Sequence, residues 1–272
     1  MTTLAISADR WTFAGLDLSS YAYLVREVSG ADEFPKLRGE DAPFTGLPGR
    51  RPMGKLADAR RLALGLWVNP LSAAGTLVEP TNRRQARKNL DELYAVLGRR
   101  AQQALVRTLP DASSRTAMAE VVDVSGFTDP VSGELFGLVV DFALADPYLY
   151  GADVVVSGAT PASPTDLTIT HPGTVRGGKV LLDFTGPVAN PRVTNVGNGQ
   201  YVEALVTVAS TKHLVIDVAA FTALNDGANA IGAIRHSGAF RFLELDPGPQ
   251  TLRVSATTPG GSLSATFSPP YL

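Results

Sequence analysis

The chain has no cysteine and few histidines, which limits the chemistry that it can carry. Among its 272 residues there is no Cys, and the three histidines are His171, His213 and His236. Without cysteine there is no disulfide framework, no thiolate metal ligand and no cysteine nucleophile. The histidines are not spaced like the ligands of a zinc site. The sequence therefore predicts neither a metal centre nor a cofactor.

Long apolar runs are missing as well. No uncharged apolar stretch is long enough to span a membrane, and residues 1–10 lack the basic and apolar regions of a signal peptide. We therefore expect a chain that is made and kept in solution and does not insert into a membrane.

Enzyme signatures are equally scarce. The nucleophile elbow, the zinc-protease motif, the phosphate-binding loop and the dinucleotide fingerprint do not occur. The segment Gly197–Gly199 is typical of a two-residue type I′ hairpin turn rather than a phosphate cradle. The carboxylates of Glu40 and Asp41 lie in the irregular segment and are more typical of a solvated loop than of acid–base catalysis. We predict that the protein is not an enzyme. A serine enzyme is the remaining alternative, because its residues can meet in space without a sequence motif.

Glycine and proline are abundant. The chain contains 26 Gly and 19 Pro, with 44% hydrophobic and 18% charged residues. Such a composition indicates many turns between short strands, and therefore a mainly β protein. The length suffices for two ordinary domains, each with its own core.

Charge is distributed unevenly although the net charge is only -2. Residues 36–115 carry 15 of the 24 basic side chains against 7 acidic ones, whereas residues 116–150 carry 6 acidic side chains and no basic one. A near-neutral chain is not typical of a general nucleic-acid binder. The pattern instead predicts two oppositely charged surfaces on one domain.

The first half contains one clear strand and one long irregular segment. Residues 61–68 alternate with period two and place Leu62, Leu64, Leu66 and Val68 on one face, which predicts a half-buried strand. Before it, residues 30–55 lose all periodicity and accumulate Pro and Gly. A loop of this length inside a domain is usually functional or disordered.

Helical signal is concentrated in residues 82–97. Thr81 or Asn82 can cap its start, and Gly98 stands where a left-handed C′ glycine would end it. The apolar face consists of Leu90, Leu93, Tyr94 and Leu97. The first turns carry Arg83, Arg84, Arg87 and Lys88, at the end where the helix dipole disfavours cations. These residues form either a solvated face or a contact with an acidic partner.

Further strands are predicted throughout the chain. In the first half they lie at about 102–108, 119–125 and 135–144, the last two joined by turn residues 129–133. In the second half they lie at about 153–157, 165–170, 178–184, 191–196, 201–208, 213–219, 239–245, 250–256 and 261–267. Short strands at regular spacing without a helix predict a sandwich or a small barrel.

The second half also resembles a known family. A strand opening with Gly186, Asn190 and Pro191, the apolar run 213–218 and the turn around Pro247 and Gly248 follow one another. This order resembles the second domain of the distal tail proteins of long-tailed bacteriophages. In the first half, residues 13–18, 38–51 and 61–68 look like the opening of such a protein, and Asp146–Tyr148 like the passage between its domains.

This resemblance implies the architecture. We expect a mainly β protein of two β-sandwich domains. The first, 1–149, would form a ring and carry the helix 82–97 and a belt-like loop, 30–55; the second, 150–272, would be galectin-like.

The resemblance also implies a structural role. A hexameric ring would lie at the distal end of the tail in the virion, after assembly in the host cytoplasm. It would link the tail tube protein to a hub or tail-associated protein and to fibre or receptor-binding proteins. Its axial passage would admit the tape measure and DNA without specific nucleic-acid binding. The belt would reach the next subunit, with expected interface residues Phe34, Leu37, Arg38, Phe44, Leu47, Arg50, Arg51, Lys55, Arg83, Arg84 and Arg87.

Two alternatives stay open. The chain could be another tail tube or baseplate component, including one of a contractile tail. It could instead be a host-recognition module that binds cell-wall glycan, since Asn190, Pro191 and Arg192 resemble part of a galectin sugar site. Both tryptophans, the usual platform for a sugar ring, lie in the first domain. Binding of glycans by residues 151–272 alone would favour recognition, and oligomerisation of the first domain alone would favour the ring.

Overall fold

The computed structural model describes residues 9–39, 42–43, 50–51, 56–128, 136–161, 163–237 and 243–272, with backbone only at 42, 43, 50, 51, 56, 127 and 128. The chain divides into two compact units, Met1–Leu149 with Leu272, and Tyr150–Tyr271. Each unit has its own hydrophobic core. Within the described ranges, no helix is long and apolar enough to cross a membrane.

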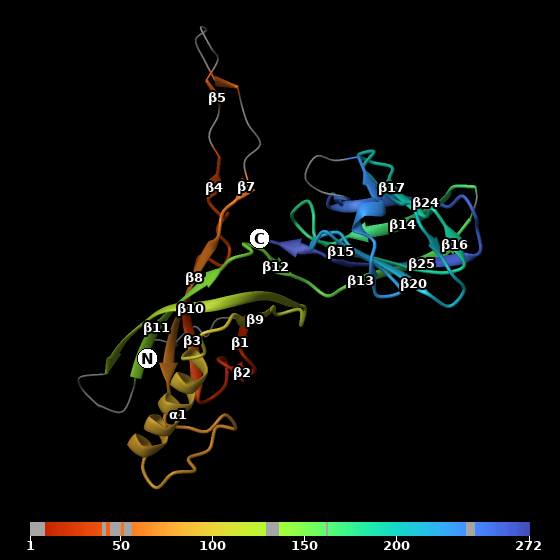
Figure 1. Cartoon of the computed structure of the whole chain (residues 1–272). Helices are drawn as coiled ribbons and strands as arrows, with labels where there is room; N and C mark the ends of the chain where they lie inside the picture. Colours follow the sequence, from red (N-terminus) through yellow and green to blue (C-terminus); the bar gives the residue numbers. More distant parts are fainter. Residues whose placement is uncertain are drawn as a thin grey trace. The chain divides into compact units, whose positions relative to one another are not determined.

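The first unit is built on one antiparallel sheet with strand order β2-β1-β9-β10-β11-β8-β3 (Figure 1). The elements in chain order are β1 Arg10–Phe13, β2 Leu16–Asp17, β3 Tyr23–Ser29, β4 Leu37–Arg38, β5 Ala42–Pro43, β6 Arg50–Arg51, β7 Leu56–Ala57, β8 Arg60–Val68, α1 Asn82–Leu97, β9 Gln103–Thr108, β10 Ser114–Thr128, β11 Phe136–Leu144 and β12 Leu149–Tyr150.

Strand β10 makes this sheet fold over a core. Its first part, Ser114–Ala119, pairs with β9, and its second part, from Glu120 onward, pairs with β11. A bulge lies between Val121 and Asp123, at the change of partner, and bulges bend strands. The two halves of the sheet therefore share one core instead of forming two separate sheets.

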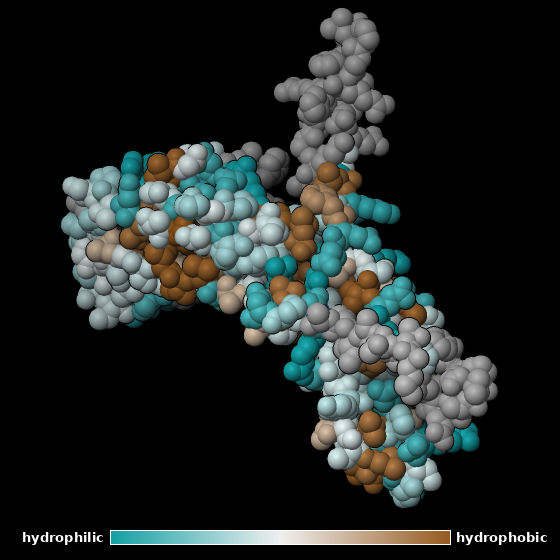
Figure 2. Space-filling model, turned by 180° about the vertical axis from the view of Figure 1, so that it is seen from behind, coloured by the Kyte–Doolittle hydropathy of each residue, from teal (hydrophilic) through white to brown (hydrophobic). Residues whose placement is uncertain are grey.

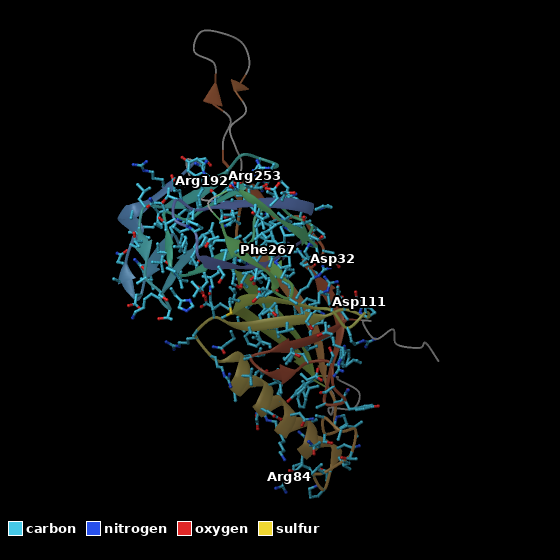
Figure 3. The ribbon with its side chains drawn as sticks, turned by 90° about the vertical axis from the view of Figure 1, so that its right-hand side faces the viewer. Asp32, Arg84, Asp111, Arg192, Arg253 and Phe267 are labelled. Atoms are coloured by element: carbon cyan, nitrogen blue, oxygen red, sulfur yellow. The ribbon has the colours of Figure 1, made fainter. Side chains whose placement is uncertain are left out.

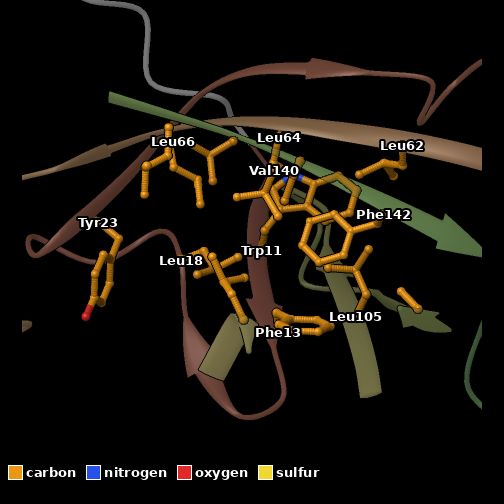
Figure 4. Packing of buried hydrophobic residues seen from close by; sticks show 14 of the residues in the cluster. Trp11, Phe13, Leu18, Tyr23, Leu62, Leu64, Leu66, Leu105, Val140 and Phe142 are labelled. Atoms are coloured by element: carbon orange, nitrogen blue, oxygen red, sulfur yellow. The ribbon is translucent and has the colours of Figure 1, made fainter. Parts of the chain in front are cut away.

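Aromatic side chains from both halves meet in that core. Phe13 of β1 and Phe142 of β11 have ring centroids 4.9 Å apart, and Trp11 is fully buried beside them (Figure 4). The alternation predicted for β8 is confirmed, because Leu62, Leu64, Leu66 and Val68 are all buried.

Helix α1 closes the core along Leu90, Leu93 and Leu97. Its start is capped by Thr81, whose hydroxyl accepts a hydrogen bond from the Arg84 backbone N–H at 3.2 Å. Two expectations for this helix are wrong. Tyr94 is 44% exposed, because the ridge 90-93-97 already faces the core. Gly98 has a right-handed φ of -73°, since its N–H simply continues the helical bonding to the Tyr94 carbonyl at 2.9 Å.

The second unit is a sandwich of two antiparallel sheets. One has the order β13-β25-β15-β20-β21-β22 and the other β14-β24-β17-β18-β23, with β16 and β19 as a separate pair. The elements are β13 Val154–Thr160, β14 Thr165–His171, β15 Lys179–Thr185, β16 Val188–Ala189, β17 Arg192–Asn195, β18 Tyr201–Ala204, β19 Thr207–Val208, β20 His213–Asp217, β21 Thr222–Asn225, β22 Ala228–Asn229, the 3-10 turn Ile231–Ala233, β23 Ile234–His236, β24 Gly248–Ser255, β25 Gly261–Ser268 and β26 Pro270–Tyr271.

Alternating apolar residues from both sheets fill the space between them. Leu182 and Phe184 of β15 and Ile216 of β20 come from one sheet, and Val193 of β17 and Val254 of β24 from the other. This is the arrangement expected of a two-sheet sandwich.

Three details of this unit differ from the prediction. The span 201–208 is two short strands, β18 and β19. The turn before β18 is longer than a two-residue type I′ turn, because β17 ends at Asn195 and only Gly199 of residues 197–199 has a positive φ, +73°. Of the predicted strand 239–245, residues 243–245 form no strand, and residues 239–242 lie outside the described residues.

At Glu244, side-chain amides form the hydrogen bonds that a neighbouring strand would otherwise form with the backbone. Its N–H donates to the Gln200 side-chain oxygen at 2.7 Å. Its carbonyl accepts from Asn195 Nδ2 at 2.8 Å and Asn198 Nδ2 at 2.9 Å. Buried Leu243 and Leu245 are thus anchored without strand pairing.

Candidate assembly surfaces

A two-stranded arm, residues 30–59, joins β3 to β8. Within it β4 pairs with β7 and β5 pairs with β6, both antiparallel, and the Asp58 N–H donates to the Lys36 carbonyl at 2.7 Å. The expected irregular loop 30–55 is therefore corrected: the segment extends the β3–β8 hairpin. This pairing cannot be predicted from periodicity, because each ladder contains only two residues per strand and so produces no repeat in the sequence.

Beyond buried Ala31 and Pro35 near its root, most described side chains of the arm face solvent. Phe34 is 67% exposed, Leu37 is 51% exposed, and Arg38 is also exposed. Of the other expected interface residues, Phe44, Leu47 and Lys55 lie outside the described residues, and for Arg50 and Arg51 only the backbone is described.

Buried Arg60, the first residue of β8, holds the root of the arm. Its Nε donates to the Gly30 carbonyl at 2.7 Å, and its terminal nitrogens donate to the carbonyls of Ala31 and, at 3.3 Å, Pro147. Burial lowers the pKa of Arg60. The guanidinium thus ties the start of the arm to the chain segment that follows β11.

Arg107 of β9 adds an ion-pair network at the same place. It donates to Asp9 Oδ2 at 2.7 Å and to Asp32 Oδ1 at 2.6 Å, and its guanidinium lies 5.6 Å from the Trp11 ring centroid. The hydrogen bond from Arg107 is the main cause that lowers the pKa of Asp32. Burial opposes the charge of Arg107, but the bonds to Asp32 and Asp9 raise its pKa overall. Charged partners therefore fix residue 32 of the arm.

The basic start of α1 lies at the other end of the unit. Figure 3 shows Asp32 near the root of the arm and Arg84 at the start of the helix. Glu79 pairs with Arg84 at 3.2 Å and with Lys88 at 3.4 Å, and Arg87 pairs with Asp91 at 3.4 Å. The structure therefore does not bring these cations together with the arm, as a single expected interface would require.

The histidines are held by separate local contacts. His171 is buried, its Nδ1 accepts from the Gly173 N–H at 2.9 Å, and burial lowers its pKa. His213 Nδ1 lies 2.9 Å from Asp183 Oδ1. Among the residues with a described position, no three His, Asp or Glu side chains gather in a group that could hold a metal ion. Glu40 and Asp41 lie outside those residues.

The Asn190–Arg192 segment is packed against its own domain. Asn190 Nδ2 donates to the Thr257 hydroxyl at 3.1 Å. The Arg192 guanidinium lies 3.9 Å from the Tyr201 ring centroid and covers one face of that ring. A sugar would have to displace this cation to stack there, which weakens the glycan alternative.

Part of the second unit is similar to a known family of phage proteins. Residues 173–271 match the sequence profile of the siphovirus-type tail component, C-terminal domain. The match lies within the second unit and does not extend to the first.

Solved structures agree with the fold. The crystal structure of the SPP1 Dit (gp 19.1) protein, described as a paradigm of hub adsorption apparatus in Gram-positive infecting phages, superposes with a TM-score of 0.69 and 16% identity. The superposition covers 97% of this chain and 99% of that chain. A chain of the phage P2 baseplate in its activated conformation with Ca superposes with a TM-score of 0.49 and 7% identity. That superposition covers 96% of this chain and 98% of the baseplate chain. No curated protein matches the sequence.

Proposed function

We propose that this chain is a structural, non-enzymatic component of the distal end of a phage tail and that it assembles as a closed ring of six copies. The ring joins the tail tube protein to the hub or tail-associated protein, with fibre or receptor-binding proteins as further partners. Its centre is an axial passage for tape measure and DNA. Residues 1–149 form the ring in this proposal, and residues 150–272 form a galectin-like domain that packs against neighbouring tail proteins.

The observation that carries this proposal is the arm. A two-stranded ribbon alone is marginally stable in water, and the arm exposes Phe34 and Leu37 while Arg60 and Arg107 fix its root. Docked across the next subunit, the arm would bury these apolar side chains and pair its basic residues with acidic ones. Its fixed root reduces the entropy lost when it docks.

Cyclic symmetry agrees with the charge pattern. Each contact in a ring joins two unlike surfaces, so one edge of a subunit must differ from the other. The excess of basic residues in 36–115 and of acidic residues in 116–150 supplies two such edges on one unit. The basic residues are poorly suited to grip DNA, because phosphate contacts bind strongly and a passage must let DNA slide.

Deleting residues 40–50 tests the proposal. The variant should fold, as judged by circular dichroism and thermal melting, but remain monomeric in native mass spectrometry, where the wild type gives a hexamer. If the deletion variant forms rings of normal size and stability, the arm is not the assembly element. If the wild type is monomeric at every concentration and also with its purified tail tube partner, the ring itself is wrong.

A further inference from the structure

Two buried amide side chains of α1 fix the loop between β8 and the helix. Asn89 Nδ2 donates to the Asn69 carbonyl at 2.8 Å and to the Leu71 carbonyl at 2.7 Å. Gln85 donates to Asn89 Oδ1 at 2.8 Å and accepts from the Glu79 N–H at 3.1 Å. The loop has no regular secondary structure, yet its backbone is held at both ends.

The middle of this loop is a closed turn packed against Tyr21. The Ser72 N–H donates to the Thr76 carbonyl at 2.7 Å, and the two hydroxyls lie 2.9 Å apart. At Gly75 an added Cβ would meet the Tyr21 ring at 3.1 Å, so the ring lies directly over the glycine. Tyr21 and the loop therefore form one surface.

This surface exposes apolar side chains. Tyr21 is 65% exposed, Leu77 47% and Val78 65%. In Figure 2, brown apolar surface gathers beside teal polar surface at the lower end of this unit. Apolar groups that a fixed loop presents to solvent mark interaction sites, because little conformational entropy remains to be lost on binding.

Cations border these apolar residues. Arg83, Arg84 and Arg87 are exposed on the first turns of α1. Arg83 makes no ion pair with any residue that the structure describes, and Arg84 shares Glu79 with a second cation, Lys88. We call Tyr21, Leu77, Val78, Arg83, Arg84 and Arg87 the tip surface. Its complement must be apolar in the centre and acidic at the edge.

The outer face of β10 and β11 has that chemistry. Val122 is 49% exposed and Val139 is 40% exposed. Asp123 and Asp141 stand directly opposite each other across the two strands, and in the described part of the chain neither forms an ion pair. Like charges in opposite positions destabilise a sheet unless a cation neutralises them. We call Glu120, Val122, Asp123, Val139 and Asp141 the acid face; Arg61 of β8 lies at its margin, opposite Ala143.

We propose that the tip surface of one subunit docks on the acid face of a second copy of this chain. Within one copy the tip surface belongs to the segment before β3, the loop after β8 and the start of α1, whereas the acid face lies on β10 and β11, and none of the described ion pairs joins the two surfaces. Docking would bury apolar side chains of both surfaces and place the arginines of α1 beside Asp123 and Asp141. This inference rests on the proposed ring and names a second contact between its subunits, separate from the arm.

Disulfide trapping tests the contact, since the native chain has no cysteine. Val78→Cys and Val139→Cys are prepared as separate variants of the full chain and mixed under mild oxidation. We expect crosslinked dimers from the mixture and none from either variant alone. Met118→Cys replaces Val139→Cys in the control, because Met118 is at least as exposed, at 45%, and lies on the part of β10 that pairs with β9. Equal crosslinking of Met118→Cys overturns the assignment.

Charge reversal tests the same contact without a covalent bond. Replacing Arg83, Arg84 and Arg87 by Glu should raise the concentration at half-assembly by about tenfold, as expected for a few exposed ion pairs. Asp123→Lys with Asp141→Lys should do the same, and both sets in one chain should restore assembly. Circular dichroism checks that each variant is folded.

The outcomes separate this contact from the ring. A wild type that never assembles overturns both proposals. A wild type that forms rings, with charge variants that assemble normally and no specific crosslink, overturns this contact and leaves the ring intact.

Discussion

Replacing Arg60 by methionine keeps a side chain of similar length but removes the hydrogen bonds that its guanidinium donates at the root of the arm, which we call the clamp. The guanidinium donates to the carbonyls of Gly30, Ala31 and Pro147, and the longest of the three bonds, at 3.3 Å, contributes least. Hydrogen bonds to a charged group are worth about 1.5–3 kcal/mol each. Two strong bonds therefore predict a loss of roughly 4 kcal/mol before any compensation.

Two effects reduce this loss. Methionine avoids the cost of burying a guanidinium, which is the cost that lowers the pKa of Arg60. A hollow of about 300 Å³, lined by Gly30, Phe34 and Arg60 among others, lets water reach the freed carbonyls. We therefore expect the free energy of unfolding of the first unit to fall by roughly 2–3 kcal/mol.

Tryptophan fluorescence during urea unfolding measures this unit selectively, because Trp11 and Trp67 both lie in it. The midpoint should fall by roughly 1–1.5 M at a slope of about 2 kcal/mol per M. The control is Arg61→Met, which changes the exposed neighbour of Arg60 and should shift stability by less than about 0.5 kcal/mol. An Arg60→Met midpoint equal to that of the control would show that the clamp does not stabilise the unit.

Three further predictions concern the core, the ion-pair network and the arm. Leu62→Asp places an unpaired carboxylate at a site that is 1% exposed, and it should abolish soluble folding in an expression and melting assay; a variant melting within a few degrees of wild type would contradict the assigned core. Arg107 lowers the folded-state pKa of Asp32, so the difference in free energy of unfolding between wild type and Asp32→Asn should be constant above about pH 5 and should vanish as the pH falls towards about 2. Urea titration at each pH measures this difference. A difference that does not change with pH would exclude the Arg107–Asp32 pair as its source. Phe34→Ser with Leu37→Ser should leave the melting temperature unchanged but weaken assembly in light scattering, and unchanged assembly would remove these residues from the interface.

Strong periodicity made the helix and the central strand predictable. Sixteen residues of α1 and nine of β8 repeat their apolar positions often enough to fix type and boundaries. Strand β3 was missed because a bulge between Val25 and Glu27 breaks its alternation. The arm was missed because each of its ladders contains two residues per strand. Local pairing of this kind depends on the hairpin behind it and leaves no trace in composition.

The polar residues that shape the surfaces were hidden for another reason. Gln85 and Asn89 belong to the polar part of the helix sequence, and nothing local indicates that they are buried. The available signal was indirect: residues 69–80 contain no regular structure, so their backbone carbonyls need donors from elsewhere. Clusters such as Arg107 with Asp9 and Asp32 join positions far apart in the chain, and a single sequence cannot reveal such pairs.

The clamp at Arg60 also has a mechanical consequence. One side chain grips the carbonyls at the base of the arm and the carbonyl of Pro147, three residues before the second unit begins. Tension applied to the second unit would reach β12 first, which pairs with β10, and would then reach Pro147. The guanidinium of Arg60 would pass part of that load to the base of the arm, so that the sheet does not carry all of it.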